Sequence, residues 1–470
     1  MPARDLPARP NLEQYKKQAK DLLKTWKKTD PGPTRRLADA QHAIAREHGF
    51  DTWKKFTQEI ARLAGAEVKH AIWKSAEDAF VAGDAKTLAR LLRAHEKLFR
   101  TERPQSSWLG GLTPDYSASD AQSIIARGHF FESWDQFAEF DKALKDSRSP
   151  TAQFERAVDA IVTGEAVLLE RSLRENPELI RMRSPRTHHS TLLHYVGANG
   201  VEGWRQRTPK NAVQLAEILL DRGADIDAVA DMYGGGCTTL GLIATSIHPK
   251  VAGVLRPLID LFLARGARID APGAGNAHAL VNGCLANGRP EAAEYLASRG
   301  APLDLEGAAG VGRLELVESF FDDDGRLKSL ATTAQLNAGF TWACEYGRTA
   351  VVEYLLDHGI DVNVLSGPHK QTGLHWAATG GHLETVKALL KRHPKLDVRD
   401  AAFTGTPLGW ALHGWWEQKE PAKREPYYEI VAQLVAAGAP VESAWLSEEN
   451  AISEPRMLAA LGGEPRPRTL

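Results

Sequence analysis

The feature that most constrains the fold is a short segment that returns along the chain at a spacing of about 34 residues. The copies read LLDRGADIDA, LFLARGARIDA, YLASRGAPLDL, YLLDHGIDVNV, LLKRHPKLDV and LVAAGAPVES, with the helix-ending position at Gly223, Gly266, Gly300, Gly359, His393 and Gly438. Successive differences between these positions are 43, 34, 59, 34 and 45, and the 59 divides into 25 and 34 if FFDDDGRLKSL, at Gly325, is a degenerate copy. In a chain of 470 residues, this period predicts a stack of small helical units rather than one core.

The most regular copy is TGLHWAATGGHLETVKALLKRHPKLDV, residues 372–398. Ala377 and Ala378 are small enough for close helix packing, and Val386, Leu389 and Leu390 form an apolar stripe at helical spacing. The segment resembles an ankyrin repeat, and the resemblance extends over residues 157 to about 442. It implies an all-α, ankyrin-like solenoid of stacked helix-turn-helix repeats, with long inter-helix insertions and an N-terminal helical extension. No unit can bury its stripe alone, so neighbours must stabilise one another.

A second kind of repetition is a duplication of two segments at one unchanged offset. DAQHAIAREHGFDTWKKF (39–56) matches DAQSIIARGHFFESWDQF (120–137) at 10 of 18 positions, and residues 76–99 match residues 157–180 at 11 of 24. Each copy carries an aromatic clamp that is predicted to be packing, and each places a glycine and an acidic residue at a helix turn. The clamps are Phe50, Trp53 and Phe56, then Phe131, Trp134 and Phe137; the turns are Gly83–Asp84 and Gly164–Glu165.

These repeats predict five regions. They are a disordered N-terminus at 1–10, a helical N-terminal module at 11–66, a related module at 67–148, the repeat array at 149–445 and a C-terminal tail at 446–470. The DAQxxIAREHGFxxW stretch ahead of the array is similar to that of bacterial ankyrin-repeat proteins, most of which have no assigned role.

Composition indicates an ordinary globular protein, with 43% hydrophobic and 25% charged residues. Three cysteines lack a disulfide framework or metal-ligand spacing, which favours a reducing cytoplasm. No signal peptide and no membrane-spanning run is expected. Residues 1–75 hold 16 Lys and Arg against 9 Asp and Glu. We interpret these charged residues as the solvent-exposed face of an amphipathic helix, with nucleic-acid binding as the disfavoured alternative.

The segment DMYGGGC, residues 231–237, interrupts this helical pattern. It falls where an ankyrin stack has its β-hairpin finger, just before an inner helix that starts near Thr238. The three glycines suit a tight turn or a backbone brought close to a ligand. Asp231, Met232, Tyr233 and Thr238 are therefore candidate binding residues. A nucleotide phosphate loop is disfavoured because no strand–loop–helix unit or lysine follows.

Histidines at the helix starts have a structural explanation. His194 and His375 occupy the histidine slot of the ankyrin motif, where the resemblance implies bonds to backbone in neighbouring hairpins. A zinc site at His188 and His189 is disfavoured because no further ligand stands at metal spacing. We predict no metal and no cofactor.

Long insertions between inner and outer helices follow Gly200, Ser246 and Gly414 and carry many aromatic residues. They form either a recognition edge or covers for helix ends, and the sequence leaves both open. Candidate binding residues here and on the neighbouring helix starts are Trp204, Arg205, Trp376, Trp410, Trp415 and Trp416.

Two functions follow from the sequence. The first is a binding scaffold, a monomer that recognises a protein or peptide partner through its concave groove and extended loops. The alternative is an enzyme that uses the stack as a scaffold, with Asp231, Tyr233, His194 and His248 doing acid–base chemistry on a small molecule. The chain lacks the standard catalytic motifs, which favours the binding scaffold.

Overall fold

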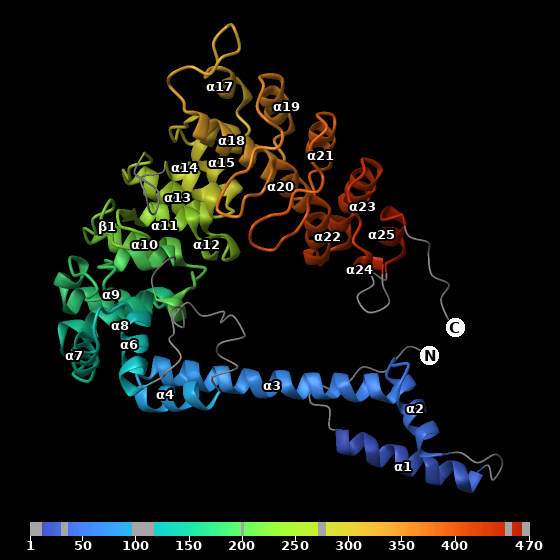
Figure 1. Cartoon of the computed structure of the whole chain (residues 1–470). Helices are drawn as coiled ribbons and strands as arrows, with labels where there is room; N and C mark the ends of the chain where they lie inside the picture. Colours follow the sequence, from blue (N-terminus) through green and yellow to red (C-terminus); the bar gives the residue numbers. More distant parts are fainter. Residues whose placement is uncertain are drawn as a thin grey trace. The chain divides into compact units, whose positions relative to one another are not determined.

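The computed structural model of the chain describes residues 12–29, 36–95, 117–198, 202–270, 279–446 and 454–462 (Figure 1). The expected disordered segment 1–10 and most of the expected tail 446–470 lie outside these residues. The chain divides into two compact units, Met1–Glu139 and Phe140–Leu470. The five-region division stays a prediction, although one helix, Trp53–Val81, runs unbroken through the expected boundary at 66/67.

All regular secondary structure in the described residues of the first unit is helical. Its helices are α1 (Leu12–Thr29), α2 (Leu37–Glu47), α3 (Trp53–Val81), α4 (Ala85–Ala94), α6 (Ala118–Gly128) and the start of α7 (Trp134–Leu144). On α1, Tyr15 and Ala19 are buried while Lys17, Lys20 and Lys24 are exposed. These three lysines therefore lie on the solvent face of an amphipathic helix, as predicted.

Both aromatic clamps are packing residues, which confirms their predicted role. Phe56 and Phe137 are buried, and each is the centre of its clamp. The Phe56 ring lies 5.5 Å from Phe50 and 5.2 Å from Trp53, and the Phe137 ring lies 5.8 Å from Phe131 and 5.3 Å from Trp134. The duplicated sequence thus folds into the same local packing twice.

The second unit is a succession of helix pairs, each packed on the next (Figure 1). Its elements are α8 (Pro150–Thr163), α9 (Ala166–Glu175), η2 (Pro177–Ile180), η3 (Leu192–Gly197), η4 (Gly203–Arg205), α10 (Ala212–Asp221), β1 (Val229–Ala230), β2 (Cys237–Thr238), α11 (Thr239–Thr245), α12 (His248–Val251), α13 (Leu255–Ala264), α14 (Leu280–Ala286), α15 (Pro290–Ser298), α16 (Leu305–Val311), α17 (Leu314–Glu318), α18 (Thr333–Glu345), α19 (Thr349–Asp357), α20 (Gly373–Thr379), α21 (Leu383–Leu390), α22 (Pro407–Glu417), α23 (Pro421–Ala436), α24 (Ser443–Leu446) and α25 (Pro455–Ala460).

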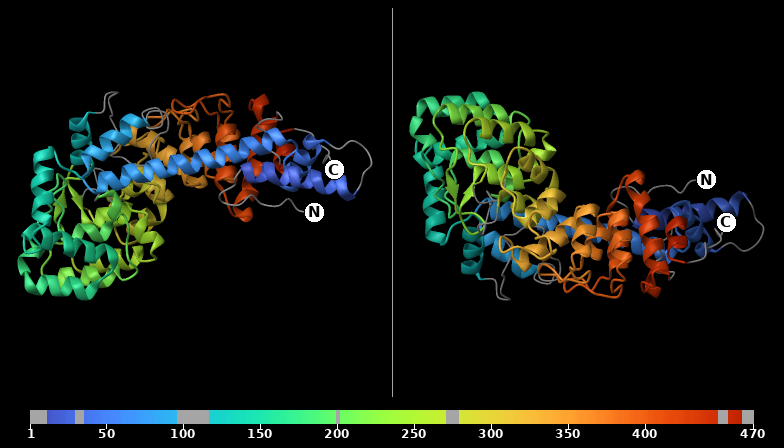
Figure 2. Two further views of the ribbon diagram at one scale, coloured as in Figure 1. Left: turned by 90° about the horizontal axis from the view of Figure 1, so that it is seen from below. Right: turned by 90° about the horizontal axis from the view of Figure 1, so that it is seen from above.

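The pairs follow one another in chain order, so the colours pass in sequence from green to red along this unit (Figure 2). Inner helices α16, α18, α20 and α22 contact one another in turn, and outer helices α17, α19, α21 and α23 form a parallel row. The degenerate copy at Gly325 belongs to a repeat of the stack, because α16 and α17 form a helix pair ahead of it. This arrangement confirms the expected all-α solenoid.

The helix-ending positions have the backbone conformation that the period predicts. Gly223, Gly266, Gly300, Gly359 and Gly438 all have φ between 83° and 97°, in the left-handed region. His393, the one non-glycine in this series, also has positive φ, at 50°. The glycines are needed at these positions because a side chain resists this conformation.

Helix α22 shows how closely inner helices approach outer ones. A Cβ atom on Gly414 would overlap the carbonyl oxygen of Thr379 and lie 2.6 Å from the Tyr427 ring. We expect Gly414→Ala to lower the free energy of unfolding by about 1–3 kcal/mol because backbone must shift to admit the methyl group.

Gly409→Ala on the same helix is the matched control, since its Cβ would meet nothing closer than 3.5 Å. This change should be neutral or stabilising by up to about 1 kcal/mol, because alanine favours the helix. Urea unfolding followed by circular dichroism measures both. Equal stability of the two variants would contradict the packing described here.

Candidate binding groove

The glycine segment forms the turn of a β-hairpin, as predicted. β1 and β2 pair antiparallel, with Val229 opposite Thr238 and Ala230 opposite Cys237. Gly234, Gly235 and Gly236 all have positive φ, of 94°, 98° and 75°. A Cβ on Gly235 would meet only Asp231, at 3.8 Å, and one on Gly236 would meet nothing within 4 Å. These two glycines therefore serve the turn rather than a close approach of backbone elements.

The candidate residues of this finger lie in different surroundings. Asp231 is exposed and its Oδ2 lies 2.8 Å from Nδ1 of His189. Tyr233 is 55% exposed, whereas Met232 is buried. Thr238 is buried and caps α11, because its hydroxyl accepts a hydrogen bond from the N–H of Gly241. Only Asp231 and Tyr233 are placed to meet a partner.

His194 is fully buried, and both of its ring nitrogens form hydrogen bonds with backbone groups of this chain. Its Nδ1 accepts the N–H of Thr191 at 3.1 Å, and its Nε2 lies 3.2 Å from the carbonyl oxygen of Cys237. His375 repeats this arrangement with Thr372, Val398 and Gly405, so both histidines are structural, as predicted. His248 begins α12 and is partly exposed. Because His194 is buried and hydrogen-bonded at both ring nitrogens, its surroundings do not favour an acid–base site that it would form with Asp231, Tyr233 and His248.

Arg205 belongs to a buried charge cluster that the sequence did not predict. The cluster joins α8 to the loop before η3 and to η4, and its members are all buried: Glu155, Arg186, His188, Tyr195, Glu202 and Arg205. Arg186 Nη1 lies 2.5 Å from Glu155 Oε1, and Arg205 Nη1 lies 2.6 Å from Glu155 Oε2. This placement gives Arg205 a role in folding; Trp204 beside it is half-buried.

Glu202 is the second anion of this charge cluster. Its Oε1 lies 3.1 Å from Arg186 Nε and accepts the hydroxyl of Tyr195 at 2.9 Å. Burial alone would raise the pKa of Glu202, but the charge of Arg186 and a hydrogen bond from His188 hold it at about 2. Glu202 therefore stays ionised inside the protein at neutral pH.

The insertion after Gly414 is helical, which corrects the expectation of a long loop. α22 continues to Glu417 and α23 begins at Pro421, so only residues 418–420 join them. Trp415 is 4% exposed, whereas Trp416 is 70% exposed. The two alternatives thus apply to different residues: Trp415 covers a helix end and Trp416 faces solvent.

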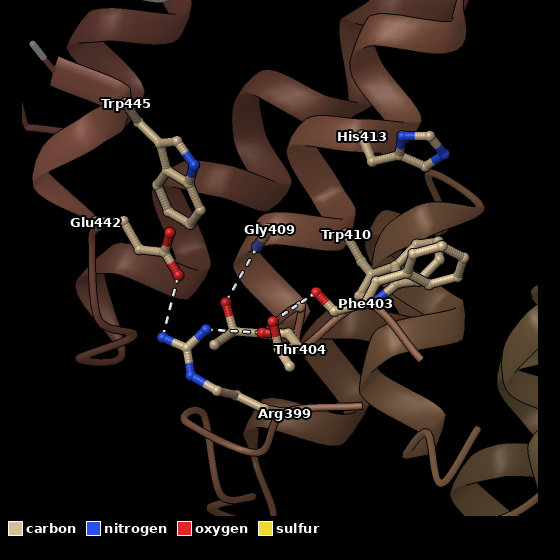
Figure 3. Close-up of a pocket in the computed structure, with 10 residues that line it drawn as sticks. Arg399, Phe403, Thr404, Gly409, Trp410, His413, Glu442 and Trp445 are labelled. Atoms are coloured by element: carbon tan, nitrogen blue, oxygen red, sulfur yellow. Dashed lines mark hydrogen bonds and ion pairs between the residues drawn. The ribbon is translucent and has the colours of Figure 1, made fainter. Parts of the chain in front are cut away.

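A pocket of about 350 Å³ opens on α22 (Figure 3). Gly409 lies between the indole rings of Trp410 and Trp445, and Arg399 pairs with Glu442 at the rim, at 3.1 Å. Phe403 and His413 stand nearly perpendicular to Trp410, with ring centroids 5.7 Å and 5.3 Å away. Gly409 occupies the slot that holds His375 in the preceding repeat, so the absent imidazole leaves room here.

Asp400 holds the wall of this pocket in place. Its carboxylate accepts the N–H groups of Ala402, Phe403 and Gly405 and the indole Nε1–H of Trp410, all between 2.8 and 3.0 Å. Burial opposes ionisation, but these hydrogen bonds lower the pKa of Asp400 to about 2. The loop 400–405 and the Trp410 ring are therefore oriented before any ligand arrives.

Trp410 is one of three tryptophans at equivalent positions. Trp342, Trp376 and Trp410 lie on α18, α20 and α22, follow one another at the period of the repeat, and are all partly exposed. We call the solvent-facing side of these three inner helices, with the pocket at its end, the groove face. Sequence reasoning missed Trp342 because the residues before it read AGFT, without the threonine and histidine of the TGLH start that precedes Trp376. The repeat period was the signal that could have found it.

Neither a metal site nor a membrane span is found among the described residues. No group of three or more histidines, cysteines or carboxylates is arranged to hold a metal ion there. No described helix is both long and apolar enough to cross a bilayer.

Comparisons with known proteins agree with this geometry. The sequence model of one family, described as ankyrin repeats in three copies, matches residues 305–400, which include α16 to α21. The stacked helix pairs define a helical repeat protein. Within this stack, residues 305–400 of the chain are ankyrin repeats.

Short stretches of three characterised proteins are similar to this chain. They are the E3 ubiquitin-protein ligase hecd-1 of Caenorhabditis elegans (44% identity over 59 residues), the palmitoyltransferase AKR1 of Lachancea kluyveri (39% over 64) and inversin of Gallus gallus (37% over 60). The matches cover 13%, 14% and 13% of this chain, but 2%, 9% and 5% of those proteins. The crystal structure of the human ASB11 ankyrin repeat domain is similar at 18% identity and a TM-score of 0.31, covering 61% of this chain and 99% of that one.

Proposed function

We propose that this protein is a binding scaffold that recognises a protein or peptide partner through the groove face. The observation that carries the proposal is the preorganised pocket at the end of this face. There, Trp410 and Trp445 flank Gly409, which stands where the ankyrin motif has a histidine. Partly exposed aromatic side chains around a concave site are the usual anchors of a protein interface. We further propose a monomer of bacterial type. We place it in the cytoplasm because Cys237, Cys284 and Cys344 are buried and form no disulfide, which suits a reducing compartment.

The proposal is tested by filling the pocket. Gly409→His should occupy it with an imidazole, and Trp410→Ala should remove one wall. Gly409→Ala and Trp416→Ala are the matched controls, because the first adds only a methyl group and the second changes an exposed tryptophan outside the pocket lining. The full chain and each variant would be immobilised, and the proteins that they retain from a lysate of the source organism would be quantified by mass spectrometry.

We expect at least one protein to be retained by the native chain and by both controls, and to fall at least about tenfold with Gly409→His and Trp410→Ala. Retention of the same proteins by all variants would show that the pocket is not the binding site. A native chain that retains nothing would also contradict the proposal.

A further inference from the structure

We propose that the groove face binds an extended, proline-rich peptide in the polyproline II conformation, with a proline at every third position packed against Trp342, Trp376 and Trp410. This inference rests on the proposed function and names the class of partner. It is carried by the placement of the three tryptophans, by the distance between their helices, and by the preorganised pocket at one end.

The three tryptophans occupy the same face of successive inner helices. In α20, residues 373–375 and 377–378 are buried, whereas Trp376 and Thr379 are partly exposed. In α22, Trp410 is partly exposed and His413 is exposed, at the same two positions. In α18 these positions hold Trp342 and Glu345, again partly exposed. Residues three apart share one side of a helix, so each helix carries its tryptophan on the equivalent, partly exposed side.

The spacing of the helices sets the spacing of the tryptophans. α18 contacts α20, and α20 contacts α22, so their axes lie about 8–10 Å apart, as packed helices do. A polyproline II helix has three residues per turn and rises about 3.1 Å per residue, which repeats its side chains on one face every ~9 Å. Each turn of such a peptide therefore advances by one inner helix and meets one tryptophan.

Other backbones fit this spacing less well. In an extended β-strand, the side chains on one face lie about 6.6 Å apart. This repeat is shorter than the spacing of the helices, so only one side chain would align with a tryptophan. On an α-helical peptide, side chains of one face recur every three or four residues, about 5–6 Å apart. Only every seventh side chain of such a peptide would meet a tryptophan. Polyproline II also carries little conformational entropy to lose, and flat aromatic rings are its common binding surface.

The pocket at α22 fixes one end of the peptide. Trp410 and Trp445 flank the open position at Gly409, and Asp400 holds the Trp410 ring by its indole N–H. A side chain that enters this pocket is held between two indole rings, while the peptide backbone continues toward Trp376 and Trp342. Because these walls are already oriented, little ordering free energy is lost on binding.

The test uses synthetic peptides and the full chain. One peptide carries proline at every third position; a second has the same composition with the prolines at every second position; a third is an amphipathic α-helical peptide. Isothermal titration calorimetry measures the Kd of each. We expect the first peptide to bind at least about tenfold more tightly than the other two. Trp376→Ala should weaken the first peptide by a similar factor, whereas Trp416→Ala should leave its Kd unchanged.

The peptide comparison needs no variant, so it is informative even if Trp376→Ala folds poorly. Equal binding of the two proline peptides, or preference for the helical peptide, would overturn the inference. If these results occur while capture from the lysate still depends on Gly409, the inference fails and the proposed function stands. If capture is insensitive to Gly409 as well, both fail.

Discussion

Replacing Glu155 with alanine is expected to lower the local free energy of unfolding by about 3–5 kcal/mol, because, among the described residues, Glu202 is then the one buried carboxylate left beside two buried guanidinium groups. The Glu155 carboxylate accepts hydrogen bonds from Arg186 Nη1 at 2.5 Å and from Arg205 Nη1 at 2.6 Å, and all three side chains are buried. Neither arginine can lose its proton to escape the cost of burial. The charges must then draw in water or unfold the segment.

Hydrogen exchange of the backbone amides in α8 and η3 measures this effect directly. A loss of this size corresponds to exchange faster by a factor of about one hundred or more. Asp159→Ala is the matched control. Asp159 pairs with Arg205 at 2.6 Å from the same helix, but its side chain is 60% exposed, so its loss should cost no more than about 1 kcal/mol. Similar exchange in the two variants would mean that the buried charge cluster does not stabilise this part of the stack.

Acid should destabilise the repeat that contains His194, by up to about 3 kcal/mol between pH 6.5 and pH 4. Burial lowers the pKa of His194 from 6.5 to about 4, although its hydrogen bond to the Cys237 carbonyl opposes this. The folded state thus takes up a proton less readily than the unfolded state. The stability from neutral His194 is complete above pH 6.5 and is lost as the pH falls toward 4.

The protonated ring would also break the helix start, because its Nδ1 could no longer accept the N–H of Thr191. Protection factors of amides in η3 and α11 at pH 7 and pH 5 measure the loss, since they divide out the intrinsic pH dependence of exchange. Glu202, with a pKa near 2, adds acid sensitivity only below about pH 4.5, so it does not contribute in this interval. Protection that is unchanged from pH 7 to pH 5 would contradict the buried, neutral state of His194.

The repeat architecture could be predicted from sequence because its signals are local. Gly359 and Gly438 end helices in the left-handed conformation, and the DMYGGGC segment turns a hairpin, each for reasons contained in a few neighbouring residues. The threonine caps and the histidine slots also depend on short spacing alone. Such features carry their own conformational preference into the fold.

The features that were missed depend on contacts between distant residues. Glu155, Arg186 and Arg205 are separated by tens of residues, and no spacing rule brings them together. The segment after Gly414 is expected as a loop because an ankyrin unit turns there in a few residues, whereas this segment is longer. However, Pro421 stands in the first turn of α23, where proline is tolerated, and Pro426 lies inside the helix at a position that packing against α22 and α25 maintains. Tertiary packing decided these cases.

The most direct test of the binding groove is site-specific photo-crosslinking with the full chain. A photoreactive phenylalanine would replace His413, which is exposed beside Trp410 on α22, or Glu384, which is exposed on the outer helix α21. If the groove face is where this protein holds its partner, irradiation in a lysate of the source organism yields a discrete adduct from position 413 and none from position 384. Adducts that form from position 384 alone, or equally from both positions, would contradict a binding site on the inner helices.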